Sequence, residues 1–295
     1  MTLAIFGRIT ENTDLHILAH FFHFLRQRQI PFMVYGNYAQ DLYGRIPEVF
    51  EQGDMRLFHR QEELRGVDFL YSFGGDGTVL EAVRFVAQLE IPIVGVNFGR
   101  LGYLTCVTQQ GLIPATEELM RGTYQIEKRS LLSVISEPPG LFGEYPYGIN
   151  DLTIHKSKTN EMITVHTYIN GEFLNSYWGD GLIVATPTGS TAYSLSCGGP
   201  IIFPSSATFA ITPVAPHSLT VRPVVIPDTW VVSFEIESRS GEAMIALDTR
   251  TELVKARTSI AVRQAGFQVR LVRISSTMYI DNLRRSLMWG KDNRN

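Results

Sequence analysis

The 295-residue chain has little of what several classes of protein require. Its two cysteines, Cys106 and Cys197, lie far apart and form no C-x-x-C pair, which argues against a disulfide framework and a cysteine zinc cluster. No apolar run is long enough to span a bilayer, and the first residues lack the basic region and apolar core of a signal peptide. We therefore expect a cytoplasmic protein without a membrane partner.

The chain also has little excess of charge of either sign. The formal net charge is −3 and no long basic stretch occurs, whereas a protein that binds duplex nucleic acid needs clustered Lys and Arg. A nucleic-acid partner is therefore not expected. His16, His20 and His23 lie at helical spacing, but no cysteine or carboxylate completes a tetrahedral set, so no side chain is assigned to a metal.

Two nucleotide-binding patterns are missing as well. No G-x-x-x-x-G-K-[ST] occurs, which disfavours a Walker-type ATPase. Gly95, Gly99 and Gly102 come near a dinucleotide fingerprint without forming G-x-G-x-x-G, so a hydride-transferring dehydrogenase is not supported.

A short apolar run, 69–73, stops in a glycine-rich loop of Gly74, Gly75, Asp76, Gly77 and Thr78, and apolar residues at helical spacing follow over 79–86. Glycines at a helix N-terminus let backbone N–H groups approach an anion, and the helix dipole adds partial positive charge. Asp76 would repel a phosphate there unless a divalent cation, or a proton to be removed, were present, and phosphoryl transfer supplies both. The alternative is a purely structural turn with Asp as a helix N-cap.

The pattern predicts an α/β domain over residues 1–125 and an all-β domain over 126–275. Strands at 3–7, 31–35, 69–73 and 91–97 alternate with helices at 13–28, 37–50, 79–86 and 113–122, which is typical of a Rossmann-like parallel sheet. The loops after residues 73 and 97 should share one edge of that sheet. Short β-type runs from residue 130 onward, with a hairpin at Asn170-Gly171, predict a sandwich. Its last strands are expected at 243–247, 259–263 and 267–274, and the segment 136–146 is expected to be an exposed loop. The tail 276–295, with a possible short helix at 281–289, could pack back on the first domain.

A second cluster of polar residues lies in the β-rich half. From Asp180 to Pro200 the chain is dense in hydroxyls and glycines, which suits a polyhydroxyl and phosphate ligand, although a Ser/Thr-capped helix start is the alternative. Asn150 and Asp151 place an amide and a carboxylate side by side. They could read an adenine edge and ribose hydroxyls, or form a simple turn.

In these stretches the chain resembles the NAD kinase family. The matching motifs are Gly74-Gly75-Asp76-Gly77-Thr78, the run from Gly95 to Leu104, Glu127-Lys128-Arg129-Ser130, Asn150-Asp151, and Asp180 through Pro200. The first loop alone is shared with diacylglycerol and sphingosine lipid kinases. The run Thr186-Pro187-Thr188-Gly189-Ser190-Thr191-Ala192-Tyr193-Ser194 is what singles out NAD kinases.

The resemblance implies magnesium-dependent transfer of the ATP γ-phosphoryl group to the 2′-hydroxyl of the adenosine ribose of NAD. Asp76 would accept the proton of that hydroxyl. It also implies a homo-oligomer, a tetramer or a dimer. Residues implied in contacts with NAD or the triphosphate are Gly74, Gly75, Gly77, Thr78, Asn97, Tyr103, Asn150, Asp151, Trp178, Asp180, Thr188, Thr191, Ala192, Tyr193, Ser194, Ser196, Asp248 and Arg250.

Three residues depart from the common family pattern, and they put substrate preference in question. Asp151 stands where Glu is frequent, Trp178 where a basic residue is often found, and Arg250 where Gln is usual. Two other functions stay open at this point, a lipid kinase with the same loop and a non-catalytic NAD-binding regulator. Asp76 argues against the regulator, because a pure binder gains little from a carboxylate among phosphates.

Overall fold

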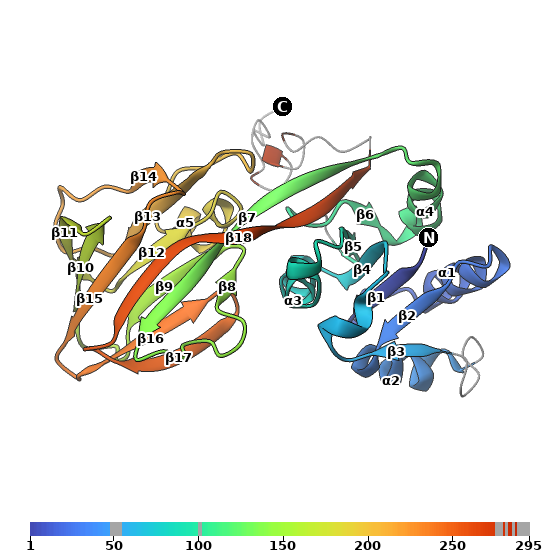
Figure 1. Cartoon of the computed structure of the whole chain (residues 1–295), viewed down its shortest axis with the longest axis horizontal. Coiled ribbons are helices and arrows are strands. Elements are labelled where there is room, and N and C mark those ends of the chain that lie inside the picture. Colours follow the sequence, from blue (N-terminus) through green and yellow to red (C-terminus); the bar gives the residue numbers. More distant parts are fainter. Residues whose placement is uncertain (48–54, 100–101, 275–279, 281–282, 285–286, 288–295) are drawn as a thin grey trace, which may run out of the picture. The chain divides into compact units, whose positions relative to one another are not determined.

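The computed structural model describes residues 1–47, 55–99, 102–274, 280, 283–284 and 287. Its contacts divide into two compact units, one formed by Met1–Glu127 with the described residues from Val269 onward, the other by Lys128–Gln268. The boundary expected from the sequence lies two residues earlier, and residues 269–275 were expected in the second domain. The chain passes between the units in two long strands that pair with each other, β7 (Tyr124–Glu137) and β18 (Ser259–Ile274) (Figure 1). The tail 276–295 and its expected helix fall largely outside the described residues.

The first unit alternates strands and helices, as the sequence predicts. No helix among the described residues is both long and apolar enough to cross a membrane. The elements are β1 (Leu3–Gly7), α1 (Leu15–Gln27), β2 (Phe32–Tyr35), α2 (Gly36–Arg45), β3 (Arg56–Phe58), β4 (Phe69–Gly74), α3 (Asp76–Val86), β5 (Ile93–Asn97), β6 (Val107–Thr108) and α4 (Leu112–Arg121), with short 3-10 helices at Gln61–Leu64, Ala87–Leu89 and Gln109–Gly111.

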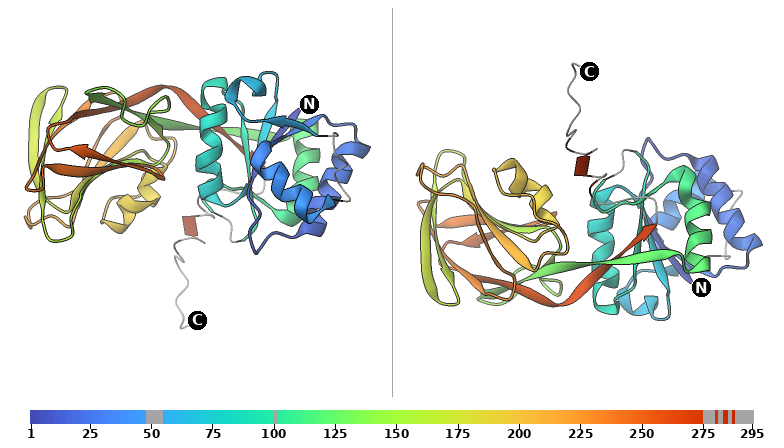
Figure 2. Two further views of the ribbon diagram at one scale, coloured as in Figure 1. Left: turned by 90° about the horizontal axis from the view of Figure 1, so that it is seen from below. Right: turned by 90° about the horizontal axis from the view of Figure 1, so that it is seen from above.

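The strands of this unit form a parallel sheet in the order β3-β2-β1-β4-β5, and the end of β18 adds to β5 in parallel. Leu3 and Ile5 belong to the hydrophobic core that also holds buried side chains of α1, α2 and α4. Phe6 points to the opposite face, where its ring lies 5.4 Å from the ring of Phe85 in α3. Helices therefore cover both faces of the sheet (Figure 2).

The adjacent strands β4 and β5 end together. Gly74 pairs in register with Asn97, and the N–H of Phe98 donates to the carbonyl oxygen of Gly74 at 3.0 Å. The carboxyl ends of parallel strands lie at one edge of a sheet, and this is where ligands of open α/β sheets bind. The expectation that the two glycine-containing loops share one edge is confirmed.

The second unit is all β apart from two short helical turns. Its elements are β8 (Tyr147–Gly148), β9 (Asp151–Lys156), β10 (Ile163–Ile169), β11 (Glu172–Gly179), β12 (Gly181–Ala185), the 3-10 helix η5 (Gly189–Thr191), α5 (Tyr193–Ser196), β13 (Thr208–Val214), β14 (Val224–Pro227), β15 (Val232–Ser238), β16 (Glu242–Leu247) and β17 (Arg250–Lys255).

Two antiparallel sheets make up this unit, in the orders β11-β10-β15-β18 and β14-β13-β12-β9-β16-β17. Side chains of both sheets, among them Val165 and Phe234 of the first and Ile154 and Val184 of the second, share one buried core, which confirms the sandwich. The hairpin between β10 and β11 is also confirmed. Asn170 and Gly171 both have positive φ, 51° and 86°, as a tight hairpin turn requires.

Several details differ from the sequence-based expectation. The segment 136–146, expected to be an exposed loop, buries Leu141 and Phe142 in the core of the second unit. Residues 259–274 form one strand instead of two, and the strand β17 has no counterpart in the prediction. The polar residues of β17 explain the omission, because its exposed positions hide the alternation that marks a strand.

Two glycine substitutions should shift stability in opposite directions. A Cβ on Gly181 would lie 2.2 Å from the carbonyl oxygen of Ile154 in the paired strand, so Gly181→Ala should lower the free energy of unfolding by about 3 kcal/mol. Gly44 is exposed in α2, and a Cβ added there would have nothing within 4 Å, so Gly44→Ala should raise it by about 0.5–1 kcal/mol. Urea denaturation of both variants checks the signs, and equal effects would contradict the packing argument.

Candidate active site

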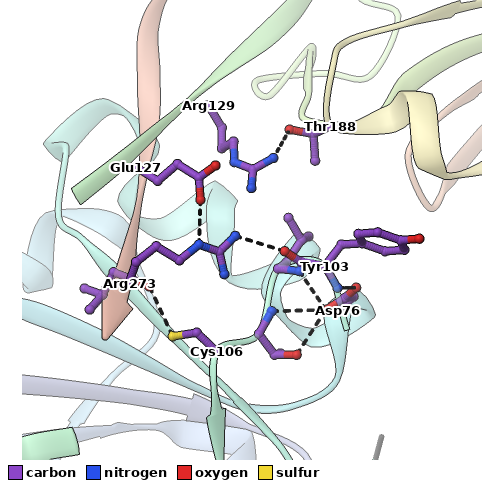
Figure 3. Close-up of polar contacts among 10 residues, drawn as sticks. Asp76, Tyr103, Cys106, Glu127, Arg129, Thr188 and Arg273 are labelled. Atoms are coloured by element: carbon purple, nitrogen blue, oxygen red, sulfur yellow. Dashed lines mark hydrogen bonds and ion pairs between the residues drawn. The ribbon is translucent and has the colours of Figure 1, made fainter. Parts of the chain in front are cut away.

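Asp76 opens α3 directly after the glycine-rich loop, and its carboxylate is held by the backbone of the segment 102–105 (Figure 3). Its Oδ2 accepts from the N–H of Tyr103 at 2.7 Å. Its Oδ1 accepts from the N–H of Leu104 at 3.0 Å, the N–H of Thr105 at 3.2 Å and, more weakly, the Thr105 hydroxyl at 3.4 Å. The carboxylate is therefore fixed in one orientation.

The two oxygens of Asp76 differ in how much acceptor capacity they retain. A carboxylate oxygen offers about two lone-pair sites. Oδ1 serves three donors of the described chain, whereas Oδ2 serves one. Oδ2 is therefore the oxygen with room for a further donor, such as the hydroxyl of a substrate.

The glycines around Asp76 fall into two groups. A Cβ on Gly74 would lie 2.1 Å from Thr78 Oγ1, and one on Gly102 would lie 2.2 Å from Asp76 Oδ1, so the protein's own packing requires these glycines. Gly75 and Gly77 have nothing within 4 Å of the same position. Packing among the described residues does not require glycine at these two sites, which is consistent with space kept for a ligand at the backbone.

Two more expected site residues hold this edge of the sheet together. Asn97 ends β5, where its Oδ1 accepts from the N–H of Gly99 at 2.7 Å and its Nδ2 donates to Thr105 Oγ1 at 3.3 Å. The Thr78 hydroxyl accepts from the N–H of Gly75 at 3.4 Å. Asn97, Tyr103 and Thr78 thus contact the same loops as Asp76.

In the second unit, Asn150 lies in a turn that leads into β9, and Asp151 is the first residue of that strand. The carboxylate of Asp248 holds this turn and the start of the strand. Asp248 accepts from the N–H groups of Ile149, Asn150 and Asp151 at 2.9, 2.8 and 3.2 Å. The carbonyl oxygen of Asn150 accepts from the N–H of Thr186 at 2.8 Å. Asp248 therefore acts here on the backbone of the turn.

The carboxyl of Asp151 is buried, with 7% of its surface exposed. Burial, and then the neighbouring Asp248, raise its pKa to about 7, against the opposing effect of a hydrogen bond from Thr153. Burial also raises the pKa of Asp248, while the three backbone donors and Arg250 act in the other direction. Two neighbouring buried carboxyl groups disfavour each other's charged form.

Two other expected residues, Tyr193 and Asp180, lie near Asp151. Partial burial, the Cys197 thiol and then the carboxylates of Asp180 and Asp151 raise the pKa of Tyr193, so these groups are near one another. Asp180 also pairs with Lys156 Nζ at 2.6 Å. Trp178 is the last residue but one of β11, and its half-exposed ring lies 4.3 Å from the ring of His217.

The hydroxyl-rich segment is partly used for the protein's own structure. Thr188 is buried and accepts from Arg129 Nη1 at 3.2 Å, and the buried Ser194 hydroxyl shares a hydrogen bond with Thr212 at 2.8 Å. Thr191 donates to the carbonyl oxygen of Thr188 at 3.1 Å. Ala192 is half-buried, and Ser196 is exposed.

Arg250 binds the backbone that precedes the turn. Its guanidinium donates to the carbonyl oxygens of Tyr145 and Tyr147 at 2.5 and 2.6 Å, and it lies over the ring of Phe142. In the structure this arginine anchors the 142–147 segment.

Sequence reasoning left out some residues that shape these groups. Arg129 stands in the Glu-Lys-Arg-Ser motif, which could have drawn attention to it, and Lys156 is a single lysine at the end of a strand. Leu104 and Thr105 act through backbone N–H groups, which no side-chain pattern reveals.

Comparison with known proteins identifies the family. The ATP-NAD kinase N-terminal domain model matches residues 3–124, and the ATP-NAD kinase C-terminal domain model matches residues 149–274. An NAD kinase of Cytophaga hutchinsonii is 40% identical over 298 aligned positions, with 100% of each chain covered. The chain belongs to the NAD kinase family.

Two solved structures share the fold of this NAD kinase family member. Yeast NADH kinase complexed with NADH has a TM-score of 0.86 at 20% identity, covering 99% of this chain and 88% of that one. An NAD kinase from Archaeoglobus fulgidus in complex with ATP has a TM-score of 0.72 at 23% identity, covering 98% and 99%. The α/β unit and the β sandwich are thus the architecture of this family. The activity is that of an NAD kinase, a phosphotransferase, and not that of a lipid kinase.

The raised pKa of Asp151 predicts a pH dependence of stability. Because its folded pKa, about 7, lies above its ordinary value of 3.8, the folded state holds the proton more tightly, and this contribution is lost as pH rises through 7. Asp151→Asn should remove that loss, so between pH 4.5 and pH 8 the variant should gain about 3 kcal/mol of stability relative to the wild type. Denaturant unfolding across this range measures it, and parallel curves for the two proteins would contradict the assignment.

Proposed function

We propose that this NAD kinase transfers the γ-phosphoryl group of ATP to the 2′-hydroxyl of the adenosine ribose of NAD, giving NADP, with Asp76 as the proton acceptor. The observation that carries the proposal is the arrangement of Asp76. Its carboxylate is oriented by backbone donors, Oδ2 retains acceptor capacity, and glycines with open space at their backbone flank it.

The chemistry suits these parts. Phosphoryl transfer passes through a loose transition state, so catalysis depends on positioning and on neutralising charge more than on covalent help. Gly75 and Gly77 leave their backbone open to phosphate oxygens, and the N-terminus of α3 adds partial positive charge. Asp76 Oδ2 would accept the proton from the attacking hydroxyl.

The single carboxylate of Asp76 beside the glycine-rich loop fits a magnesium ion that substrate phosphates also bind. The described residues include no group of three His, Cys, Asp or Glu side chains that could hold a metal ion. Mg²⁺ usually binds through one or two carboxylates together with substrate phosphates and water, so it needs no cage of protein ligands. Asp76 is the carboxylate beside the glycine-rich loop that would help to hold the ion. When bound, the ion neutralises charge on the triphosphate.

Residues of the second unit would bind the dinucleotide. Asn150 presents an amide from a braced turn, and Asp151, Asp180 and Tyr193 gather polar groups suited to ribose hydroxyls. Direct contacts of Thr188, Ser194, Asp248 and Arg250 with substrate stay predictions, because these side chains bind the protein itself. Homo-oligomeric assembly and a cytoplasmic location likewise stay predictions.

Replacing the proposed base tests the mechanism. Asp76→Ala should lower kcat for NADP formation by roughly a hundredfold or more, because the hydroxyl loses its proton acceptor. NADP is measured with an NADP-specific dehydrogenase in the presence of magnesium, ATP and NAD. Asp41→Asn, a change on the exposed surface of α2, is the matched control and should keep full activity. Near-normal kcat in the Asp76 variant would exclude it as the base.

A methyl group in the glycine-rich loop tests whether the backbone of that loop binds phosphate. Gly75→Ala places a Cβ where no described atom lies, so the melting temperature should not fall, whereas KM for ATP should rise by about tenfold as backbone access is blocked. Gly44→Ala is the control for a glycine replaced away from the site. An unchanged KM for both substrates would show that the Gly75 backbone does not contact phosphate.

A further inference from the structure

A largely buried arginine lies behind the segment that holds Asp76. Arg273, near the end of β18, donates through Nε to Glu127 Oε2 at 2.5 Å and through Nη2 to the carbonyl oxygen of Tyr103 at 3.0 Å (Figure 3). The side chains of Arg273 and Glu127 are 11% and 25% exposed. All these groups belong to the first unit.

One peptide group connects this arginine to Asp76. The peptide between Tyr103 and Leu104 accepts from Arg273 through its carbonyl oxygen and donates to Asp76 Oδ1 through its N–H. A charged donor at a carbonyl polarises the amide and strengthens the hydrogen bond that its N–H makes. Glu127, Arg273, this peptide and Asp76 thus form one chain of hydrogen bonds with alternating charge.

The proposal builds on the role of Asp76 given under the proposed function. We propose that Arg273, braced by Glu127, is a positioning residue that fixes the 102–105 backbone and thereby aims the Asp76 carboxylate at the acceptor hydroxyl. In this role Arg273 acts on the backbone of 102–105 and not on the substrate.

The geometry explains why an arginine serves here. Its planar fork can donate to a carboxylate and to a carbonyl oxygen at fixed angles at the same time, whereas a lysine ammonium is a point charge on a flexible stem. The segment 102–105 lies in no strand, so side-chain hydrogen bonds must hold it. A displacement of about 1 Å at a reacting group can cost on the order of a hundredfold in rate.

The same strand provides a matched control. Arg270 also lies on β18 and pairs with a glutamate, Glu90, but this pair is more exposed, with side chains 34% and 46% accessible. Arg270 pairs with Glu90, and not with the described segment 102–105. Glu90 follows the helical stretch that Asp76 begins, so it lies at the opposite end of that stretch. Arg273→Met and Arg270→Met therefore remove the same charge and leave the same side-chain bulk, with only the first affecting the segment that binds Asp76.

The experiment compares Arg273→Met, Arg273→Lys and Arg270→Met with the wild type and Asp76→Ala in the full chain. Arg273→Met should lower kcat by about ten- to a hundredfold with the dissociation constant for NAD nearly unchanged. Arg273→Lys should recover part of this loss, and Arg270→Met should stay near the wild type. Amide hydrogen exchange of Tyr103, Leu104 and Thr105 should accelerate in Arg273→Met and not in Arg270→Met.

Losing one partner of a buried pair could prevent folding, because the other charge is then left unpaired. The double variant Glu127→Gln/Arg273→Met removes both charges and should show the same loss of kcat and the same faster exchange. Equal kcat in the Arg273 and Arg270 variants, or unchanged exchange at 103–105, would overturn the inference even if Asp76→Ala is inactive. An active Asp76→Ala would instead refute the proposed base, and the exchange data would still report on the segment.

Discussion

The register between β4 and β5 determines where the chemistry of the first unit lies. Because the two parallel strands end together at Gly74 and Asn97, the loops that follow them meet at one edge of the sheet. Only this meeting lets the Asp76 carboxylate reach the N–H groups of Tyr103, Leu104 and Thr105. A carboxylate at a helix N-terminus is thus turned into an oriented group with one oxygen available.

In the second unit a carboxylate likewise accepts hydrogen bonds from backbone N–H groups. There the Asp248 carboxylate receives the N–H groups of residues 149–151 and shapes the turn that presents Asn150. Asp248 itself has a positive φ of 52°, which a short polar side chain tolerates at a tight turn. Burial raises the pKa of Asp248, and burial followed by the neighbouring Asp248 raises the pKa of Asp151, so the group that holds the turn also affects the protonation of its neighbour.

The three departures from the common family pattern have different structural contexts. Arg250 binds the carbonyl oxygens of Tyr145 and Tyr147, so it supports the chain before the turn. Trp178 pairs with the ring of His217 instead of supplying a positive charge. Asp151 has a side chain one methylene shorter than Glu, and its carboxyl remains buried against Thr153 and Asp248. Each departure is accommodated by local contacts within the second unit.

Much of the fold was accessible from the sequence because it depends on local patterns. Alternating strands and helices mark the first unit, and Asn170-Gly171 marks a hairpin because its two residues accept positive φ. The path of β18 was not accessible. Its alternation shows a strand, but pairing partners are set by distant contacts, so the sequence could not reveal that the strand leaves the sandwich and joins β5.

For the site, the sequence determined which groups are present: the glycine-rich loop with Asp76, the Asn150-Asp151 pair and the hydroxyl-rich run. Tertiary structure decided what each group faces. It turned Asp248, Arg250, Thr188 and Ser194 toward the protein's own backbone and side chains, and it placed Arg273 behind Tyr103, 170 residues away along the chain. Residue type fixes what a group can donate or accept, but its hydrogen-bond partners come from segments that only folding brings together.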